Sequence, residues 1–306
     1  MKIINFGSLN IDKIYHVKEF VMAGQTIKAS SYQTASGGKG FNQSLSAAKA
    51  GADVLHAGFI GQDGQFLKKE LEDSHVNVDM LETVDLPTGH AIIEVNAEGQ
   101  NRIIIHGGSN LCFDISYIKR VLDQCTANDF VLLQNETNCT AEIIHSAHQK
   151  GMQVVFNPSP MPEDLSLLPL SDVDCFIVNE VEGFQLAEAL GLHPSEKEHD
   201  HILSVLAENY PEKDIIMTLG EEGVLYQKGS LKHHMKAFPV NVIDTTAAGD
   251  TFTGYFLAAV CKGKEIYTAL QEASAASAIA VSRMGAGPSI PSYCEVKAFL
   301  RERIPQ

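Results

Sequence analysis

The chain has 306 residues, of which 44% are hydrophobic, so it is long enough and apolar enough to bury a full core. Its formal net charge of -15 argues against a nucleic-acid or anionic-membrane surface, because both reward clustered lysine and arginine. No apolar run reaches the length of a signal peptide or of a membrane span, so we expect a cytoplasmic protein.

Short β-branched runs alternate with helical patterns through the first two thirds of the chain. Buried strands are predicted at 2–7, 53–61, 129–134, 152–157, 174–179 and 214–220. Apolar residues at helical spacing predict helices at 42–51, 65–74, 114–125, 141–151, 180–191 and 201–210. This alternation predicts an α/β fold with a mainly parallel, doubly wound sheet flanked by helices. Ligands of such folds bind at the carboxyl ends of the strands.

Two regions, about 12–34 and 89–107, do not fit this alternation. Each has the pattern of an antiparallel hairpin, and the second contains alternating strands around the turn "NAEGQN". We interpret them together as a small β-sheet that serves as a lid. The alternative is that they are ordinary edge hairpins.

The last part of the chain changes to helices in succession. The segment 238–243, "FPVNVI", looks strand-like, and helical patterns follow at 247–263, 264–285 and 293–304. The first two of these helices are rich in alanine, glycine and serine, which allow backbones to pack closely. We therefore expect the helix after Asp250 to be central to the fold.

The late motif "DTTAAGDTF", residues 244–252, leads through small residues into that apolar helix. The turn at Ala247, Ala248 and Gly249 leaves the first backbone N–H groups of the helix free, and these favour an anion. Asp250 beside them could accept a proton from a hydroxyl that attacks the bound anion. The alternative is that Asp250 only stabilises the first helical turn.

The early motif "ASGGKGFNQS", residues 35–44, packs three glycines around a lysine just ahead of a helix. Such glycines allow the backbone to approach a ligand closely, and Lys39 and Asn42 offer donors for hydroxyl oxygens. The motif matches neither a Walker A loop nor a dinucleotide fingerprint. The alternative is a flexible glycine turn.

Further polar residues follow predicted strands. Asn10 and Asp12 come after the first strand, and Glu136 ends "LLQNE". If the fold brings these side chains together at the carboxyl edge of the sheet, they would suit a polyhydroxy ligand. Asn179 and Glu182 lie three apart on one helix face, where they could orient water on a divalent cation near phosphate.

In both motifs and their order, the chain resembles the ribokinase family, the PfkB carbohydrate kinases, over essentially its whole length. The resemblance implies one ribokinase-like α/β domain across 1–306, with the lid at about 12–34 and 89–107. It implies that Asp250 is the catalytic base and that Ala247, Ala248 and Gly249 form the anion hole. It places the sugar against Asn10, Asp12, Gly38, Lys39, Asn42, Glu136 and Asp250.

The resemblance also implies the other ligands. ATP would lie near Asn179, Thr218, Gly220, Thr245 and Gly249, with Glu182 helping to place Mg²⁺. A monovalent cation, usually K⁺, would lie near Asp244, Thr246, Ala280, Arg283, Gly285 and Ser289. The lid hairpins would form a homodimer interface.

We therefore predict an ATP-dependent sugar kinase that converts D-ribose to ribose 5-phosphate at the primary hydroxyl. The lysine of "GGKGFNQ" favours the ribokinase branch, whereas Gln25, Phe41 and Asn135 depart from its usual pattern and leave the sugar open. Alternatives are another pentose, a ketohexose such as fructose, a keto-deoxy sugar acid or a nucleoside. A non-catalytic sugar-binding regulator is a further alternative, although such a protein would be expected to lose Gly249 or Asp250.

Overall fold

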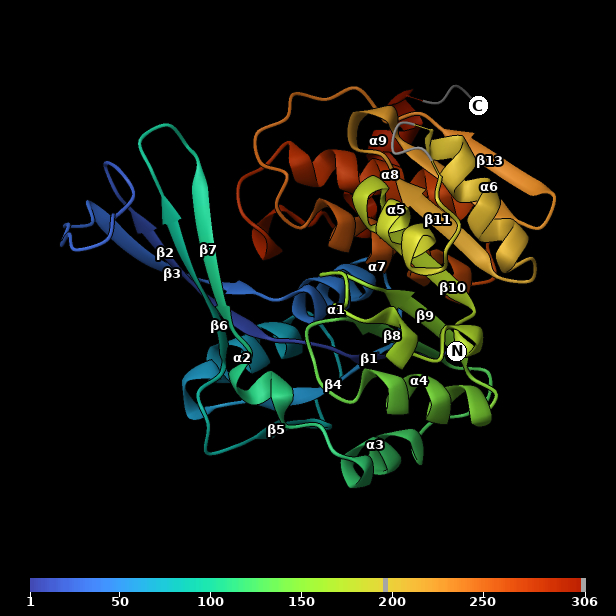
Figure 1. The fold of residues 1–306 in the computed structure, drawn as a ribbon, viewed down its shortest axis with the longest axis horizontal. Coiled ribbons are helices and arrows are strands. Elements are labelled where there is room, and N and C mark those ends of the chain that lie inside the picture. Colours follow the sequence, from blue (N-terminus) through green and yellow to red (C-terminus); the bar gives the residue numbers. More distant parts are fainter. Residues whose placement is uncertain (195–197, 304–306) are drawn as a thin grey trace.

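The computed structural model describes residues 1–194 and 198–303. Within them, two β-sheets are accompanied by helices (Figure 1). The strands of the large sheet are β1 (Ile3–Phe6), β4 (Val54–Ile60), β5 (Leu81–Thr83), β8 (Phe130–Gln134), β9 (Gln153–Asn157), β10 (Cys175–Asn179), β11 (Asp214–Thr218), β12 (Val224–Lys228) and β13 (Leu231–Met235). Their spatial order is β13-β12-β11-β10-β9-β8-β1-β4-β5.

All neighbours from β5 to β11 pair in parallel, whereas β12 and β13 add an antiparallel edge. Strands β1, β4 and β8 are buried along their whole length, because helices cover both faces of the sheet. The chain passes from β1 to β4 on one side and later continues from β8 on the other. Ligands of doubly wound sheets bind at such a reversal, which here lies at the carboxyl ends of β1 and β8.

The helices divide into two layers. One hydrophobic cluster joins the sheet to α1 (Lys39–Lys49), α2 (Gln65–Asp73), α7 (Ala248–Cys261), α8 (Ile266–Val281) and α9 (Tyr293–Arg303). A second cluster joins the opposite face to α3 (Ile115–Leu122), α4 (Thr140–Gln149), α5 (Glu180–Ala189) and α6 (His199–Asn209). The predicted α/β fold, a mainly parallel sheet flanked by helices, is therefore confirmed.

Helix α7 packs closely on α1. A Cβ atom on Gly254 would lie 2.6 Å from the backbone N of Ala47 and 2.5 Å from the Ser46 side chain. The Ser46 hydroxyl donates to the carbonyl of Thr251 at 2.8 Å. This close approach needs glycine, and it brings the early and late motifs side by side.

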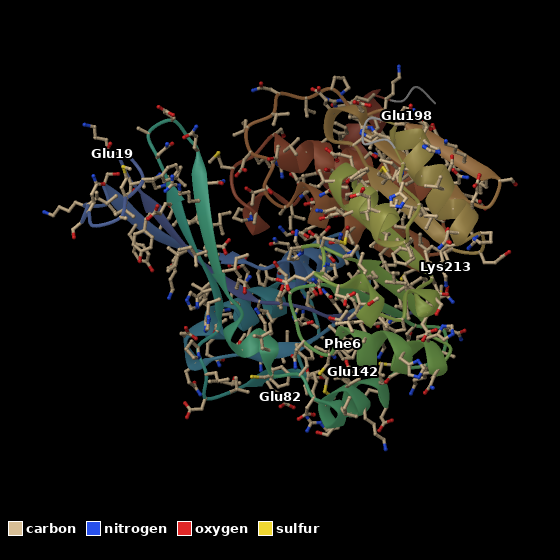
Figure 2. The ribbon with its side chains drawn as sticks, viewed as in Figure 1. Phe6, Glu19, Glu82, Glu142, Glu198 and Lys213 are labelled. Carbon is tan, nitrogen blue, oxygen red and sulfur yellow. The ribbon has the colours of Figure 1, made fainter. Side chains whose placement is uncertain are left out.

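The small sheet consists of β2 (Asn10–His16), β3 (Ser31–Gly37), β6 (Gly89–Val95) and β7 (Asn101–His106). Each predicted hairpin is antiparallel, and β2 and β6 join them in parallel, giving the order β3-β2-β6-β7. The sheet projects from the main body (Figure 1). Glu19, in its β2–β3 loop, lies far from Phe6 of strand β1 in the large sheet (Figure 2). The predicted small sheet is therefore confirmed.

The segment 238–243 is not a strand, so that prediction is wrong. Pro239 has no N–H to donate, and Val242 and Ile243 are 59% and 54% exposed. The N–H groups of Ile243 and Asp244 both donate to the carbonyl of Val281, which ties the segment to the end of α8. Within the described ranges, no helix is both long and apolar enough to cross a membrane.

Candidate active site

The early and late motifs meet at Asp250, whose side chain is only 7% exposed. Its Oδ2 accepts a hydrogen bond from Asn42 Nδ2 at 3.0 Å, and its Oδ1 accepts one from Gln43 Nε2 at 2.8 Å. Burying a carboxylate is costly unless donors satisfy it, and here two amides do so. Asp250 is thus bound to the other motif as well as starting a helix.

The turn before Asp250 leaves backbone donors free. Ala247 adopts a left-handed conformation with φ of 58°, and the N–H of Ala248 donates to the carbonyl of Thr245 at 3.2 Å. The N–H groups of Gly249 and Asp250 have no acceptor among residues 1–194 and 198–303. They lie at the positive end of the helix dipole, so this turn can bind an anion. Ala248, by contrast, has its amide engaged within the turn.

A cleft of about 690 Å³ opens beside this turn. Of the residues predicted to bind nucleotide or anion, it is lined by Thr218, Gly220, Thr245, Ala248 and Gly249. The rest of its wall is largely apolar and includes Phe238, Val240, Val242, Ala278 and Val281. An apolar wall next to free N–H groups suits a flat heterocycle that carries phosphates.

Asn179 and Glu182 are not among the residues that line this cleft. They form a capping box at the start of α5, in which Asn179 Oδ1 accepts from the N–H of Glu182 at 2.8 Å. Glu182 Oε2 accepts in turn from the N–H of Asn179 at 3.0 Å. The spacing that we interpreted as a cation site therefore has a local structural role.

Carboxylates gather around Lys39 at the carboxyl ends of β1 and β8. Glu136 Oε2 accepts from the Lys39 N–H at 2.9 Å and from the Ser8 hydroxyl. Burial raises the pKa of Glu136, although these hydrogen bonds oppose the effect. Burial lowers the pKa of Lys39, but the charges of Asp250, Glu136 and Glu182 outweigh it and raise that pKa above its usual value. The ammonium group is therefore charged amid acids from three different segments.

Asp12 lies on β2 of the small sheet, with its carboxylate directly over Gly37 of β3. A Cβ at Gly37 would lie 2.3 Å from Asp12 Oδ2, so a larger residue there would displace this carboxylate. Burial, together with the nearby charge of Glu136, raises the pKa of Asp12 to about 6. Gly38 follows with φ of 93° and lies against the backbone of Asn10, so it needs to be glycine.

Asn10, another residue predicted to bind the sugar, is held by Asn110. The sequence alone did not predict a role for Asn110. Its Oδ1 accepts from the N–H of Leu9 at 2.9 Å, and its Nδ2 donates to Asn10 Oδ1 at 2.8 Å. Asn110 is 100 residues away from Asn10 in sequence. Only its position beside the glycine pair of "HGGSN" could have drawn attention to it.

The predicted monovalent-cation residues lie on turns that Asp244 joins. Its Oδ1 accepts from the N–H of Thr246 at 2.9 Å, and its Oδ2 accepts from the N–H of Gly285 at 2.8 Å. Burial acts to raise the pKa of Asp244, but a hydrogen bond from the Thr246 hydroxyl, together with those two N–H groups, outweighs it and lowers the pKa. Ala280 lies at the end of α8, before Gly285 in the sequence, and Ser289 follows Gly285. Both residues are buried.

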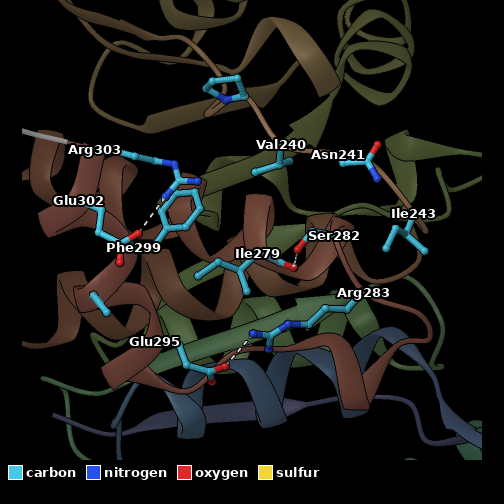
Figure 3. A pocket seen from close by; sticks show the side chains of 12 residues that line it. Val240, Asn241, Ile243, Ile279, Ser282, Arg283, Glu295, Phe299, Glu302 and Arg303 are labelled. Carbon is cyan, nitrogen blue, oxygen red and sulfur yellow. Dashed lines mark hydrogen bonds and ion pairs between the residues drawn. The ribbon is translucent and has the colours of Figure 1, made fainter.

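The side chain of Arg283 points away from these turns. It extends across a second hollow to Glu295, with Nη2 and Oε1 2.6 Å apart (Figure 3). Only the backbone of Arg283 is therefore in a position to contribute to a site that the Asp244 turns form.

Three residues depart from the usual ribokinase pattern, and none of them is among the site residues described above. Phe41 is fully buried in the core and packs near Gly287, so its ring points toward the 287 loop. Asn135 donates to the carbonyl of Pro160 at 2.9 Å. Gln25 accepts from the N–H of Met22 in an exposed loop.

Comparison with known proteins identifies the same family that the two motifs indicated. The model of the pfkB family carbohydrate kinases matches residues 1–293. Ribokinase of Staphylococcus aureus is 33% identical, covering 96% of this chain and 98% of its own. The crystal structure of Cryptococcus neoformans ribokinase in complex with ADP is 34% identical with a TM-score of 0.87, covering 97% of this chain and 98% of its own. Arabidopsis thaliana ribokinase complexed with ribose and ATP is 28% identical with a TM-score of 0.87, covering 98% of each chain.

The chain belongs to the pfkB family of carbohydrate kinases. It is an ATP-dependent sugar kinase with the ribokinase-like fold. The prediction of a phosphotransferase that uses an alcohol group as acceptor is thereby confirmed at the level of the family.

Proposed function

We propose that this enzyme transfers the terminal phosphoryl group of ATP to the primary hydroxyl of D-ribose and so forms ribose 5-phosphate. The observation that carries the proposal is the place of Asp250. It lies between the free N–H groups at the mouth of the cleft and the cluster around Lys39. The similarity to Arabidopsis thaliana ribokinase, whose structure is complexed with ribose and ATP, supports both substrates.

In the proposed mechanism, Asp250 takes the proton of the attacking hydroxyl. The hydroxyl oxygen forms a bond to the terminal phosphorus, the bond from that phosphorus to the bridging oxygen breaks, and ADP leaves with the electron pair. The N–H groups of Gly249 and Asp250 stabilise the charge on the transferring group. Ala247 and Ala248 shape the turn that presents them.

Sugar hydroxyls find matching partners around Lys39. Carboxylate oxygens of Asp12 and Glu136 accept hydrogen bonds, and the ammonium group of Lys39 donates them. Asn42 Oδ1 is buried and has no partner among the described residues, so it remains available as an acceptor. We assign Asn10, Gly38 and Asp250 to the same sugar site.

Two metal ions fit residues of this chain. Mg²⁺ accompanies ATP in such reactions and neutralises phosphate charge. Only one oxygen of Glu182 accepts a hydrogen bond within its capping box, so the other can accept one from water on that ion. The ionised carboxylate of Asp244 and the carbonyls of Ala280, Arg283 and Gly285, with Thr246 and Ser289, fit K⁺. That ion would hold the two turns together beside α7.

We propose that the chain is one domain and that its small sheet closes over the sugar as a lid. Asp12 and Asn10 lie on this sheet, so closure would bring them to the substrate. Water is then excluded from the phosphoryl group. ATP hydrolysis without sugar should accordingly be slow, and fast sugar-independent hydrolysis would count against closure.

The same sheet is proposed to form a homodimer. Ile103, Ile104 and Ile105 on edge strand β7 are 52%, 68% and 58% exposed, and Tyr32 on β3 is 53% exposed. Strands β7 and β3 are the two opposite edges of this sheet, and apolar edges of this kind are normally covered by a partner. Sedimentation at micromolar concentration should give twice the mass of one chain; a single-chain mass would refute the interface.

The sugar is tested by ADP release in a panel that holds ATP constant. D-Ribose should give the highest kcat/KM, ahead of 2-deoxy-D-ribose, fructose, a keto-deoxy sugar acid and a nucleoside. A faster rate with one of the others would reassign the acceptor. Sugar binding without ADP production would instead identify a regulator.

Replacing Asp12 by asparagine should raise the KM for the sugar at least tenfold at pH 7.5, because one of the two acceptor oxygens becomes an N–H donor and the negative charge is lost. It should also stabilise the sugar-free protein by about 1–2 kcal/mol. The folded-state pKa of Asp12 lies above its unfolded value, so the ionised form opposes folding once the pH rises through about 6. This advantage should disappear as the pH falls toward 4. Thermal unfolding across this range checks it, with Asp85→Asn in an exposed loop as control.

A further inference from the structure

A chain of buried amides leads from Asp250 into the large sheet. Gln43 is fully buried, and its Nε2 donates to Asp250 Oδ1 at 2.8 Å and to Asn157 Oδ1 at 3.0 Å. Its own Oε1 accepts from Gln134 Nε2 at 2.7 Å. Both N–H bonds and the oxygen of the Gln43 amide are therefore engaged.

The partners of Gln43 are themselves anchored to strands. Gln134, the last residue of β8, donates also to Asn5 Oδ1 of β1 at 3.0 Å. Asn157, the last residue of β9, donates to the carbonyl of Ile177 in β10 at 2.8 Å. Asn5 Nδ2 donates to the Gly40 carbonyl and to Ser44, each at 2.8 Å. The amide of Gln43 thus rests on residues of the parallel sheet.

This network permits one orientation of the Gln43 amide. If the amide turned over, Oε1 would face the Asp250 carboxylate and Nε2 would face Gln134 Nε2. Both pairs are repulsive, and buried polar groups without partners are costly. The donor of Gln43 therefore stays directed at Asp250 Oδ1.

We propose that Gln43 is a positioning residue for phosphoryl transfer, which holds Asp250 Oδ1 so that Oδ2 takes the proton of the sugar hydroxyl. Oδ2 is the oxygen that Asn42 contacts, and Asn42 belongs to the proposed sugar site. Gln134, one of the two strand ends that hold Gln43, lies two residues before Glu136. One rigid frame therefore places both the base and the sugar pocket. This inference rests on the proposed role of Asp250.

The test compares Gln43→Met with Gln134→Met. The first removes the donor to Asp250, whereas the second breaks the next link and leaves that donor in place. Both delete a buried amide of the same size. We expect Gln43→Met to lower kcat about 10- to 100-fold, as loss of a supporting hydrogen bond commonly does, with the KM values for sugar and ATP within about threefold. Gln134→Met should lower kcat less than Gln43→Met does, because Asn157 still accepts from Gln43 Nε2 and keeps the donor directed at Asp250 Oδ1.

The pH profile gives a readout that packing alone does not move. A donor to the ionised form stabilises it, so its loss should shift the acidic limb of the kcat profile to higher pH in Gln43→Met only. Equal loss of kcat in both variants, or an unshifted acidic limb in Gln43→Met, would overturn the proposal.

A crystal structure of the unmodified enzyme with sugar and a non-hydrolysable ATP analogue tests the same point without any variant. Gln43 Nε2 should remain on Oδ1 while Oδ2 faces the hydroxyl, and a Gln43 side chain turned away from Asp250 would refute the role. Assays use the sugar that the unmodified enzyme phosphorylates fastest. Failure of the proposed function would be seen in that enzyme itself, whereas failure of this inference would be seen only between the variants or in that crystal structure.

Discussion

Replacing Asp250 by asparagine should lower kcat about 100- to 10,000-fold, the usual effect of losing a general base. The amide cannot take the proton of the sugar hydroxyl. Its nitrogen would also face one of the two donors, Asn42 or Gln43, and this mismatch should cost about 1–3 kcal/mol of stability. ADP release at saturating sugar and ATP measures the rate, and thermal unfolding measures the folded fraction.

Asp114→Asn is the matched control. Asp114 caps α3 by accepting from the N–H of Tyr117, and asparagine caps a helix about as well. The control should keep both rate and stability. Near-normal turnover in folded Asp250→Asn would show that Asp250 is only a structural residue at the start of α7.

Replacing Gly249 by alanine should reduce kcat/KM for ATP at least 100-fold while leaving the protein as stable or more stable. A Cβ at Gly249 meets nothing within 4 Å, so the methyl group fits the folded chain without a clash. Alanine also favours a helix over glycine by up to about 1 kcal/mol. The methyl group would, however, enter the cleft at the free N–H groups, where the proposal places the terminal phosphate.

Gly254→Ala, on the same helix, should show the opposite pattern. Its Cβ would lie 2.5–2.6 Å from atoms of α1, so it should destabilise the fold. Titration calorimetry with ATP and thermal unfolding separate the two effects. Unchanged ATP affinity and turnover in Gly249→Ala would refute an anion site at this turn.

The balance between function and stability differs among the proposed residues. Asp12 and Asp250 are both acids in largely buried surroundings, yet Asp250 accepts two amide hydrogen bonds and Asp12 accepts none from the described residues. We therefore expect stability gains from neutralising Asp12 and losses from neutralising Asp250. Both changes should impair activity.

The sequence by itself determined the local elements and their class. Alternating buried strands and helices predicted the parallel sheet, because period and burial are properties of short segments. The hairpins of the small sheet followed from strand alternation around a turn. The prediction of a strand at 238–243 was wrong because it also used only local sequence. The β-branched residues of this segment favour a strand, but Pro239 and the hydrogen bonds to Val281 override that preference. Asn179 and Glu182, whose spacing suggested a cation site, also form the cap of helix α5, and their role toward the cation stays a prediction.

Only the tertiary structure decided which polar groups meet. Gln43 and Asp250 are 207 residues apart and are joined because Gly254 lets α7 pack against α1. Asn110 reaches Asn10, and Gly285 reaches Asp244, through similar long-range packing. A hydrogen bond needs atoms within about 3 Å, and no local pattern fixes the distance between segments so far apart in the chain. The motifs therefore predicted the chemistry, and helix packing on the sheet decided which amide supports the carboxylate.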